Sequence, residues 1–212
     1  MKRHIDGGLN FFSSVAAGVV LSLGCVANIR VGGIAGAFLF GLGLFLVCVG
    51  GLHLVTGKMC FLFVHGGDKN LIFKLPVWLW GNWIGAAVMG LFISCTGVAS
   101  GEAIARAKME IPPFEFFLRA ILCEMFIFIA VRGYRHVKDP LGKYICVFLG
   151  VAMFILCGGE HCIADAFYLP FCPLSICPVR TYVFRVMLVF AGNLLGAVLC
   201  AGHVYLIHEE DG

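Results

Sequence analysis

Residues 158–165 read Gly-Gly-Glu-His-Cys-Ile-Ala-Asp, and they interrupt a long apolar run with a polar, glycine-containing segment. About half a chain length earlier, residues 51–58 (Gly-Leu-His-Leu-Val-Thr-Gly-Lys) interrupt another apolar run in the same way. A second pair repeats at a similar offset, Gly-Asn-Trp-Ile-Gly-Ala at 81–86 and Gly-Asn-Leu-Leu-Gly-Ala at 192–197. The chain therefore contains two copies of one unit. Two matched interruptions in a membrane protein are typical of a transporter or channel.

The composition indicates a membrane protein. Of the 212 residues, 61% are hydrophobic and only 13% are charged, which is more apolar surface than a soluble domain of this length can bury. A helix needs about 20 apolar residues to cross the hydrocarbon layer. Six apolar runs are long enough: residues 9–28, 32–64, 76–97, 114–133, 144–169 and 182–207.

We therefore predict an all-α membrane protein with a single transmembrane channel domain over residues 1–212. Its six transmembrane helices would form two inverted three-helix repeats, residues 9–97 and 114–207, because three spans per copy turn the second copy upside down. Helices 2 and 5 contain the polar interruptions and are expected to be broken. Unwound backbone in a bilayer is tolerated where protein buries it or it lines a cavity, so the two breaks should meet at the pathway.

Charge placement predicts the orientation. With the N-terminus inside, eight Lys and Arg residues fall in inner segments and four in outer loops, which agrees with the positive-inside rule. Both termini are then cytoplasmic, and we expect a multi-pass protein of the inner (plasma) membrane. The net charge of +3 gives no indication of nucleic-acid binding.

The eleven cysteines do not predict a metal site, because no paired Cys-x-x-Cys set is present. Most lie within apolar runs, where cysteine packs as a small hydrophobic residue. Two alternatives stay open. Cys172 and Cys177 could form a disulfide, and Cys157 and Cys162 beside Glu160 and His161 could serve a membrane-embedded thiol, redox or metal enzyme.

The order and spacing of four segments resemble the formate/nitrite transporter family. Residues 156–170 are similar to its fifth-helix motif, residues 53–57 to the Ω-loop of its second helix, residues 119–123 to the start of its fourth helix, and residues 192–196 to its sixth helix. The resemblance implies a homopentamer of aquaporin-like protomers, each with its own pore for a small monovalent anion. It also implies a channel rather than an enzyme, and no cofactor.

The resemblance implies roles for single residues. His161 would be the central pore histidine and Thr56 its hydroxyl partner. Two hydrophobic constrictions would flank this pair, formed by Phe40, Leu44, Leu54 and Phe154. Lys108 matches a lysine that draws anions into the vestibule, and Asn193 lies in the sixth-helix motif as a candidate for loop support.

This chain departs from the family pattern at four positions. His53 replaces the usual Glu, and Lys58, Glu124 and Asp165 stand where asparagines are usual. Because a lone charge inside a membrane is costly, we expect Lys58 and Asp165 to form an ion pair. Glu124 is expected either to hold a helix–helix contact or to line the vestibule. Glu160 is expected to support the loops by accepting backbone N–H groups.

The predicted function is passage of formate or nitrite, with hydrosulfide as the alternative within the same family. An anion that loses its water between hydrophobic constrictions pays a large desolvation cost. Either it crosses as the neutral acid, or Thr56, His161 and the helix ends stabilise its charge. Because histidine ordinarily titrates near pH 6.5, His161 would couple flux to pH and protons.

Overall fold

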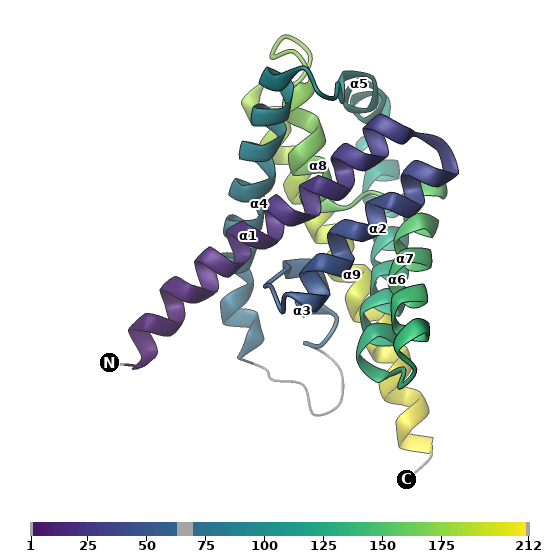
Figure 1. The fold of residues 1–212 in the computed structure, drawn as a ribbon. Helices are drawn as coiled ribbons and strands as arrows, with labels where there is room; N and C mark the ends of the chain where they lie inside the picture. Colours follow the sequence, from purple (N-terminus) through teal and green to yellow (C-terminus); the bar gives the residue numbers. More distant parts are fainter. Residues whose placement is uncertain (1, 63–69, 211–212) are drawn as a thin grey trace.

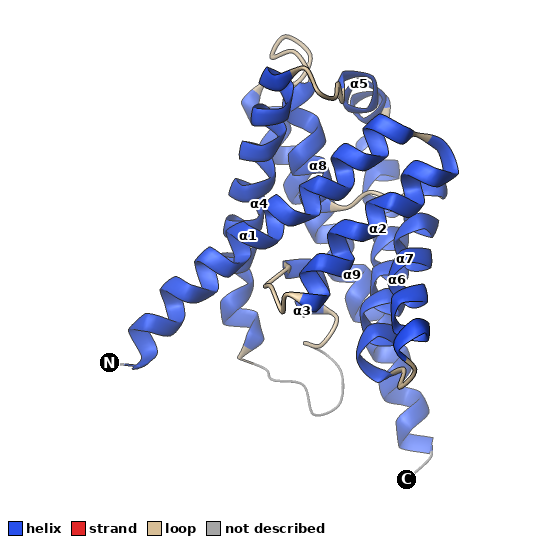
Figure 2. Cartoon of the chain, viewed as in Figure 1, coloured by secondary structure: helices blue, strands red, loops and turns tan. Residues whose placement is uncertain are grey.

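The computed structural model describes residues 2–62 and 70–210, with side chains placed for residues 8–62 and 70–202. Helices account for its regular structure, and no strand occurs in these ranges (Figure 2). The helices are α1 (Lys2–Val31), α2 (Gly33–Val49), α3 (Val55–Met59), α4 (Leu71–Thr96), α5 (Glu102–Glu110), α6 (Pro113–His136), α7 (Pro140–Leu156), α8 (Cys162–Tyr168) and α9 (Val179–Glu210), with a 3-10 turn, η1 (Leu169–Phe171), after α8.

The two predicted breaks are present. α2 ends at Val49 and α3 begins at Val55, and α7 ends at Leu156 and α8 begins at Cys162. The second residue of each break is a glycine in the left-handed conformation, at φ 63° for Gly51 and φ 69° for Gly158. Such φ values are strained for residues with a Cβ, so glycine at these two positions turns the chain out of the helix. Gly57, by contrast, lies inside α3 and does not border the break.

The helices pack in two similar sets. α1 packs against α2 and α4, α6 packs against α7 and α9, and α2 and α7 join the two sets. α1 climbs from the N-terminus toward the end that carries α5, and α9 returns from that end, so both termini lie at the same end of the molecule (Figure 1).

Three helices are long and apolar enough by themselves to cross a membrane: Gly8–Val31, Leu71–Thr96 and Val179–Gly202. α2 and α7 are shorter because the breaks end them after 17 residues. α6 has 24 residues but carries acidic and basic side chains, including the buried Glu124. Among the described residues, length and apolarity alone therefore identify three of the unbroken helices, but not α6 or the two broken ones.

Glycines place the backbones of neighbouring helices in contact at matched positions. A Cβ on Gly85 of α4 would overlap the carbonyl oxygen of Val15 in α1. In the second set, a Cβ on Gly196 of α9 would lie 2.6 Å from the carbonyl oxygen of Ile121 in α6. The repeated Gly-x-x-x-Gly segments at 81–85 and 192–196 therefore let neighbouring helices approach closely.

The substitution Gly85→Ala is expected to lower the stability of the protein by about 1–3 kcal/mol, because the new methyl group forces α1 and α4 apart. Thermal unfolding in detergent measures this loss. Gly8→Ala, on α1 and with nothing near the position of its Cβ, is the control and should leave the unfolding temperature unchanged. Equal unfolding temperatures for the two variants would contradict this account of the contact.

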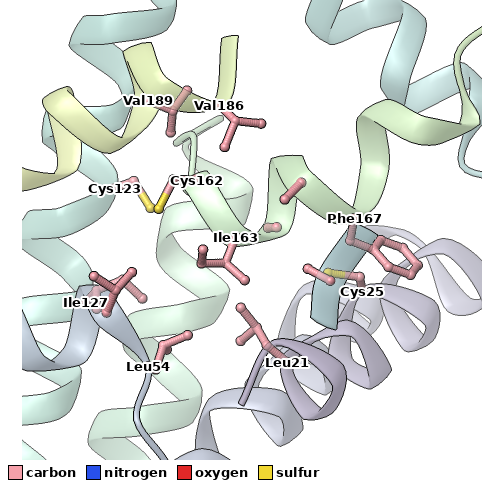
Figure 3. Close-up of a cluster of buried hydrophobic side chains, with 14 of the residues drawn as sticks. Leu21, Cys25, Leu54, Cys123, Ile127, Cys162, Ile163, Phe167, Val186 and Val189 are labelled. Carbon is pink, nitrogen blue, oxygen red and sulfur yellow. The ribbon is translucent and has the colours of Figure 1, made fainter. Parts of the chain in front are cut away.

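The hydrophobic core surrounds α8. Figure 3 shows Ile163 and Phe167 of α8 among side chains from α1, α6 and α9, with the sulfur atoms of Cys123 and Cys162 directed toward each other. Both thiols are fully buried in the apolar cluster. They therefore serve as packing residues. All eleven cysteines are free thiols, so the disulfide considered for Cys172 and Cys177 is not formed.

Candidate functional site: a buried histidine between two cavities

Two asparagines hold the broken segments in place with equivalent hydrogen bonds. The side-chain oxygen of Asn82 (α4) accepts from Val55 N–H at 2.7 Å, and its amide nitrogen donates to the carbonyl oxygens of Ser14 and His53. Asn193 (α9) does the same in the second half. It accepts from Cys162 N–H at 3.0 Å and donates to the carbonyl oxygens of Ala120 and Glu160. Each asparagine thus satisfies backbone groups that the break leaves without helical partners.

We expect Asn193→Ala to destabilise the protein by about 2–3 kcal/mol, since it removes three hydrogen bonds and leaves two buried backbone groups of the break, Cys162 N–H and Glu160 C=O, without this partner. Asn82→Ala should cost a similar amount, because it removes the equivalent three hydrogen bonds. Chemical denaturation in detergent measures both. Ser94→Ala is the control, because the Ser94 hydroxyl is exposed and donates only within its own helix, to Leu91 O. A stability of Asn193→Ala equal to that of the control would refute the supporting role.

The breaks bring Thr56 and His161 together. Thr56 Oγ1 lies 3.0 Å from His161 Nε2, and both side chains are buried. His161 caps α8, with its Nδ1 accepting from Ala164 N–H at 3.3 Å. Since Nδ1 is an acceptor, the neutral ring carries its proton on Nε2 and donates it to Thr56. The single hydroxyl proton of Thr56 is then available to another acceptor.

Aromatic side chains cover this pair on one side. The Phe154 ring stacks on His161 with centroids 6.0 Å apart, and Phe40 meets Phe154 edge-on at 5.6 Å. Phe154 reaches the histidine through the break, where Gly159 N–H donates to Phe154 O at 2.7 Å. All four predicted constriction residues, Phe40, Leu44, Leu54 and Phe154, are buried.

Two cavities are lined by the residues predicted to form the constrictions. The larger, about 310 Å³, is lined by Phe40, Phe154 and His161 and by residues of α5, at the end opposite the termini. The smaller, about 80 Å³, is lined by Leu44 and Leu54 and by the last turn of α6. The four residues predicted to form the constrictions therefore divide into a phenylalanine pair that lines one cavity and a leucine pair that lines the other.

A buried cluster of three charges lies at the larger cavity. Lys108 of α5 forms ion pairs with Glu160 Oε2 and, at 2.8 Å, with Asp165 Oδ1. Asp165 has no well-directed hydrogen-bond donor among the described residues, and Lys108 is its ion-pair partner there. Burial by itself lowers the pKa of Lys108, but the carboxylates of Asp165 and Glu160 outweigh burial and raise that pKa above its usual range. Lys108 is therefore an ammonium at every physiological pH.

Arg185 of α9 positions Lys108. Its guanidinium donates to the carbonyl oxygens of Met109 at 3.0 Å and Ile111 at 2.7 Å, which end α5, and lies 4.9 Å from the Phe116 ring centroid. Sequence analysis missed this residue. An arginine just inside the last apolar run is the signal that was available.

The predicted ion pair between Lys58 and Asp165 is wrong. Asp165 pairs with Lys108, and Lys58 lines the smaller cavity on the other side of the constrictions. The repeat alignment places the two residues at equivalent positions, but equivalent positions of two repeats need not touch. Glu160 also differs from expectation: its side chain binds Lys108, and the backbone N–H groups of the break go to Asn193 and to carbonyl oxygens instead.

Glu124 holds a helix contact and does not line either cavity. The Cys60 thiol, just after α3, donates to Glu124 Oε1 at 3.2 Å, and the carboxyl group is fully buried. Of the two roles considered for Glu124, the structure favours the contact between α6 and α3. Among the described residues no group of three or more His, Cys, Asp or Glu side chains is arranged to hold a metal ion.

Three polar side chains that the sequence did not single out also line the larger cavity: Asn28, Arg119 and Tyr168. Asn28 Nδ2 donates to the Tyr168 hydroxyl at 3.1 Å, and Arg119 pairs with Glu115 one turn away on α6. One indication of Tyr168 was present in the sequence: it lies within residues 156–170, the segment that resembles the fifth-helix motif and contains His161.

Comparison with known proteins agrees with this geometry. The sequence model described as formate/nitrite transporter matches residues 3–207. The chain belongs to the formate/nitrite transporter family. Among relatives of this family member, the uncharacterized transporter YwcJ of Bacillus subtilis is 27% identical, over 84% of this chain and 75% of its own. The formate channel FocA of Haemophilus influenzae is 25% identical, over 92% of this chain and 84% of its own.

Solved structures of other members share the fold. A pentameric formate channel with formate bound superposes with a TM-score of 0.82 at 21% identity, covering 96% of this chain and 98% of the other. A second structure, an ion channel of the same family, superposes with a TM-score of 0.84 at 22% identity and covers 97% of this chain and 92% of the other. This chain therefore has the same fold, with its two broken helices, as these solved channel structures.

Proposed function

We propose that this chain forms a pore for small monovalent anions of weak acids, formate or nitrite. This proposal rests on the Thr56–His161 pair, which is buried between two cavities where both broken helices end. A formate channel among the relatives and another among the solved structures support this choice of substrate.

The mechanism must compensate for the water that the anion loses between the phenylalanine and leucine pairs. The Thr56 hydroxyl accepts from His161 Nε2–H and donates its own proton to the anion. The positive ends of both N–H and O–H dipoles then point toward the negative charge. A donor fixed in a dry site stabilises charge more strongly than one in water. We propose that this chain of donors, linked to the protonation of the anion itself, makes flux depend on pH.

The protein is proposed to work as a homopentamer in the plasma membrane, with two inverted three-helix halves and both termini cytoplasmic. The pentameric neighbour and the excess of basic residues in the segments predicted to be inner support these assignments. The exposed apolar side chains of α4 and α6, such as Phe92 and Ile129, would face lipid or a second protomer.

A flux panel tests the function. Purified protein in liposomes should pass formate and nitrite at least tenfold faster than protein-free liposomes, and acetate more slowly, because acetate is wider. Faster flux of hydrosulfide than of formate and nitrite would favour the alternative substrate. The absence of flux for all four anions, together with a stoichiometric bound metal or thiol-dependent turnover, would favour the membrane enzyme.

A further inference from the structure

The smaller cavity carries positive charge that the described structure does not neutralise. Its lining includes Lys58 of α3 and Arg135 of α6 but no Asp or Glu. Lys58 is half-buried, and it makes no ion pair within residues 8–62 and 70–202. Two cations that share a small cavity repel each other unless an anion lies between them.

Contacts with neighbouring side chains fix one of these cations in place. The Arg135 guanidinium carbon lies 3.7 Å from the centroid of the Phe61 ring, a cation–π contact. Tyr134, next to it in α6, adds a hydroxyl-bearing side chain to the lining. The cavity volume of about 80 Å³ exceeds the ~10–15 Å³ that one water needs, so a small hydrated anion fits.

The larger cavity has the opposite character. Its lining holds Lys108 and Arg119 but also Glu160 and Asp165. Lys108 is engaged by both of these carboxylates, and Arg119 pairs with Glu115. The carboxylates that face Lys108 and Arg119 therefore outnumber the two cations on that side, and no positive charge of the described residues there is left without a partner for the anion-attracting role expected for Lys108.

We propose that Lys58 and Arg135 form a binding site for a small monovalent anion at the pore mouth nearer the chain termini. The site makes the two entrances unequal: anions saturate the pore at lower concentration from the Lys58 side than from the α5 side. The proposal rests on the proposed function, since the same anion then passes Thr56 and His161.

The first test measures saturation from each side. Protein is reconstituted in liposomes, its orientation is assigned by protease access to a C-terminal tag, and formate flux is recorded against formate concentration on each side. Lys58→Gln should raise the half-saturation concentration on the Lys58 side about tenfold, the lower end of the concentrating effect of a single-sign cleft. The α5 side should change less than twofold, and added inert salt should shrink the difference by screening.

Lys138→Gln is the matched control, because Lys138 is an exposed lysine at the same end that does not line the cavity. A half-saturation concentration for Lys58→Gln equal to that of Lys138→Gln would overturn the proposal while leaving the proposed function intact.

A second test does not require flux. Formate binding to the detergent-solubilised protein is followed by saturation-transfer NMR in the wild type, in Lys138→Gln and in Lys58→Gln/Arg135→Gln. The double variant should lose at least half of the signal that the other two retain. Equal signals in all three proteins would refute the site, even if the wild type proved to transport a different anion.

Discussion

Lys108→Met is expected to prevent most of the protein from accumulating in its folded form. The substitution leaves the carboxylates of Glu160 and Asp165 buried without a cation, and removing one partner of a buried ion pair costs about 3–5 kcal/mol. That is a large part of the total stability of a typical domain. Size-exclusion chromatography of the detergent extract and thermal unfolding measure the loss.

Neutralising the carboxylates should reverse this defect. The triple variant Lys108→Met/Glu160→Gln/Asp165→Asn is expected to recover folded protein, because no unpaired charge remains. Arg106→Met is the control on the same helix, since Arg106 forms only an exposed pair with Glu102. If Lys108→Met folds as well as Arg106→Met, the three groups do not form a charged cluster in the native protein.

His161→Phe is expected to reduce formate flux about 100-fold while the protein still folds. Phenylalanine fills the same space and can stack on Phe154, but it removes the donor to Thr56. Loss of one fixed donor to a buried charge typically costs 10²–10³ in rate. Liposome uptake from pH 5 to 8 is the measurement, and the residual flux of the variant should vary less with pH than that of the wild type.

Two further variants separate the hydrogen bond from packing. Thr56→Ser keeps the hydroxyl and should retain most of the flux, whereas Thr56→Val keeps the shape and should lose it. His53→Phe is the histidine control. His53 lies in the break between α2 and α3, and its ring centroid is 5.3 Å from that of Trp78. Wild-type uptake by His161→Phe across this pH range would exclude the proposed role of the histidine.

The positions of the breaks were predictable because their cause is local. A left-handed glycine and a polar segment within an apolar run stop a helix wherever they occur, so Gly51 and Gly158 mark the breaks from the sequence. The close contacts of α4 and α9 also have a local cause, because the matched Gly-Asn segments present a glycine face that permits close approach of a neighbouring helix.

Partners of the charged residues were not predictable in the same way. The repeat alignment paired Lys58 with Asp165, but Asp165 meets Lys108, which lies on a short amphipathic helix outside both repeats. Which cation reaches a buried carboxylate depends on where α5 folds back over the break, and Arg185 holds α5 there from the far end of the chain.

The sequence by itself determined the class of protein, the two interrupted spans and the histidine between them, because apolar length, glycine placement and a short polar segment act within a few residues. Only the tertiary structure decided which cations have a carboxylate partner and which cavity each predicted constriction residue lines. It also decided that Lys58 and Arg135 line the same cavity. Those facts depend on distances between helices that are remote in the chain, and Coulomb and hydrogen-bond energies follow distance in space, not separation in sequence.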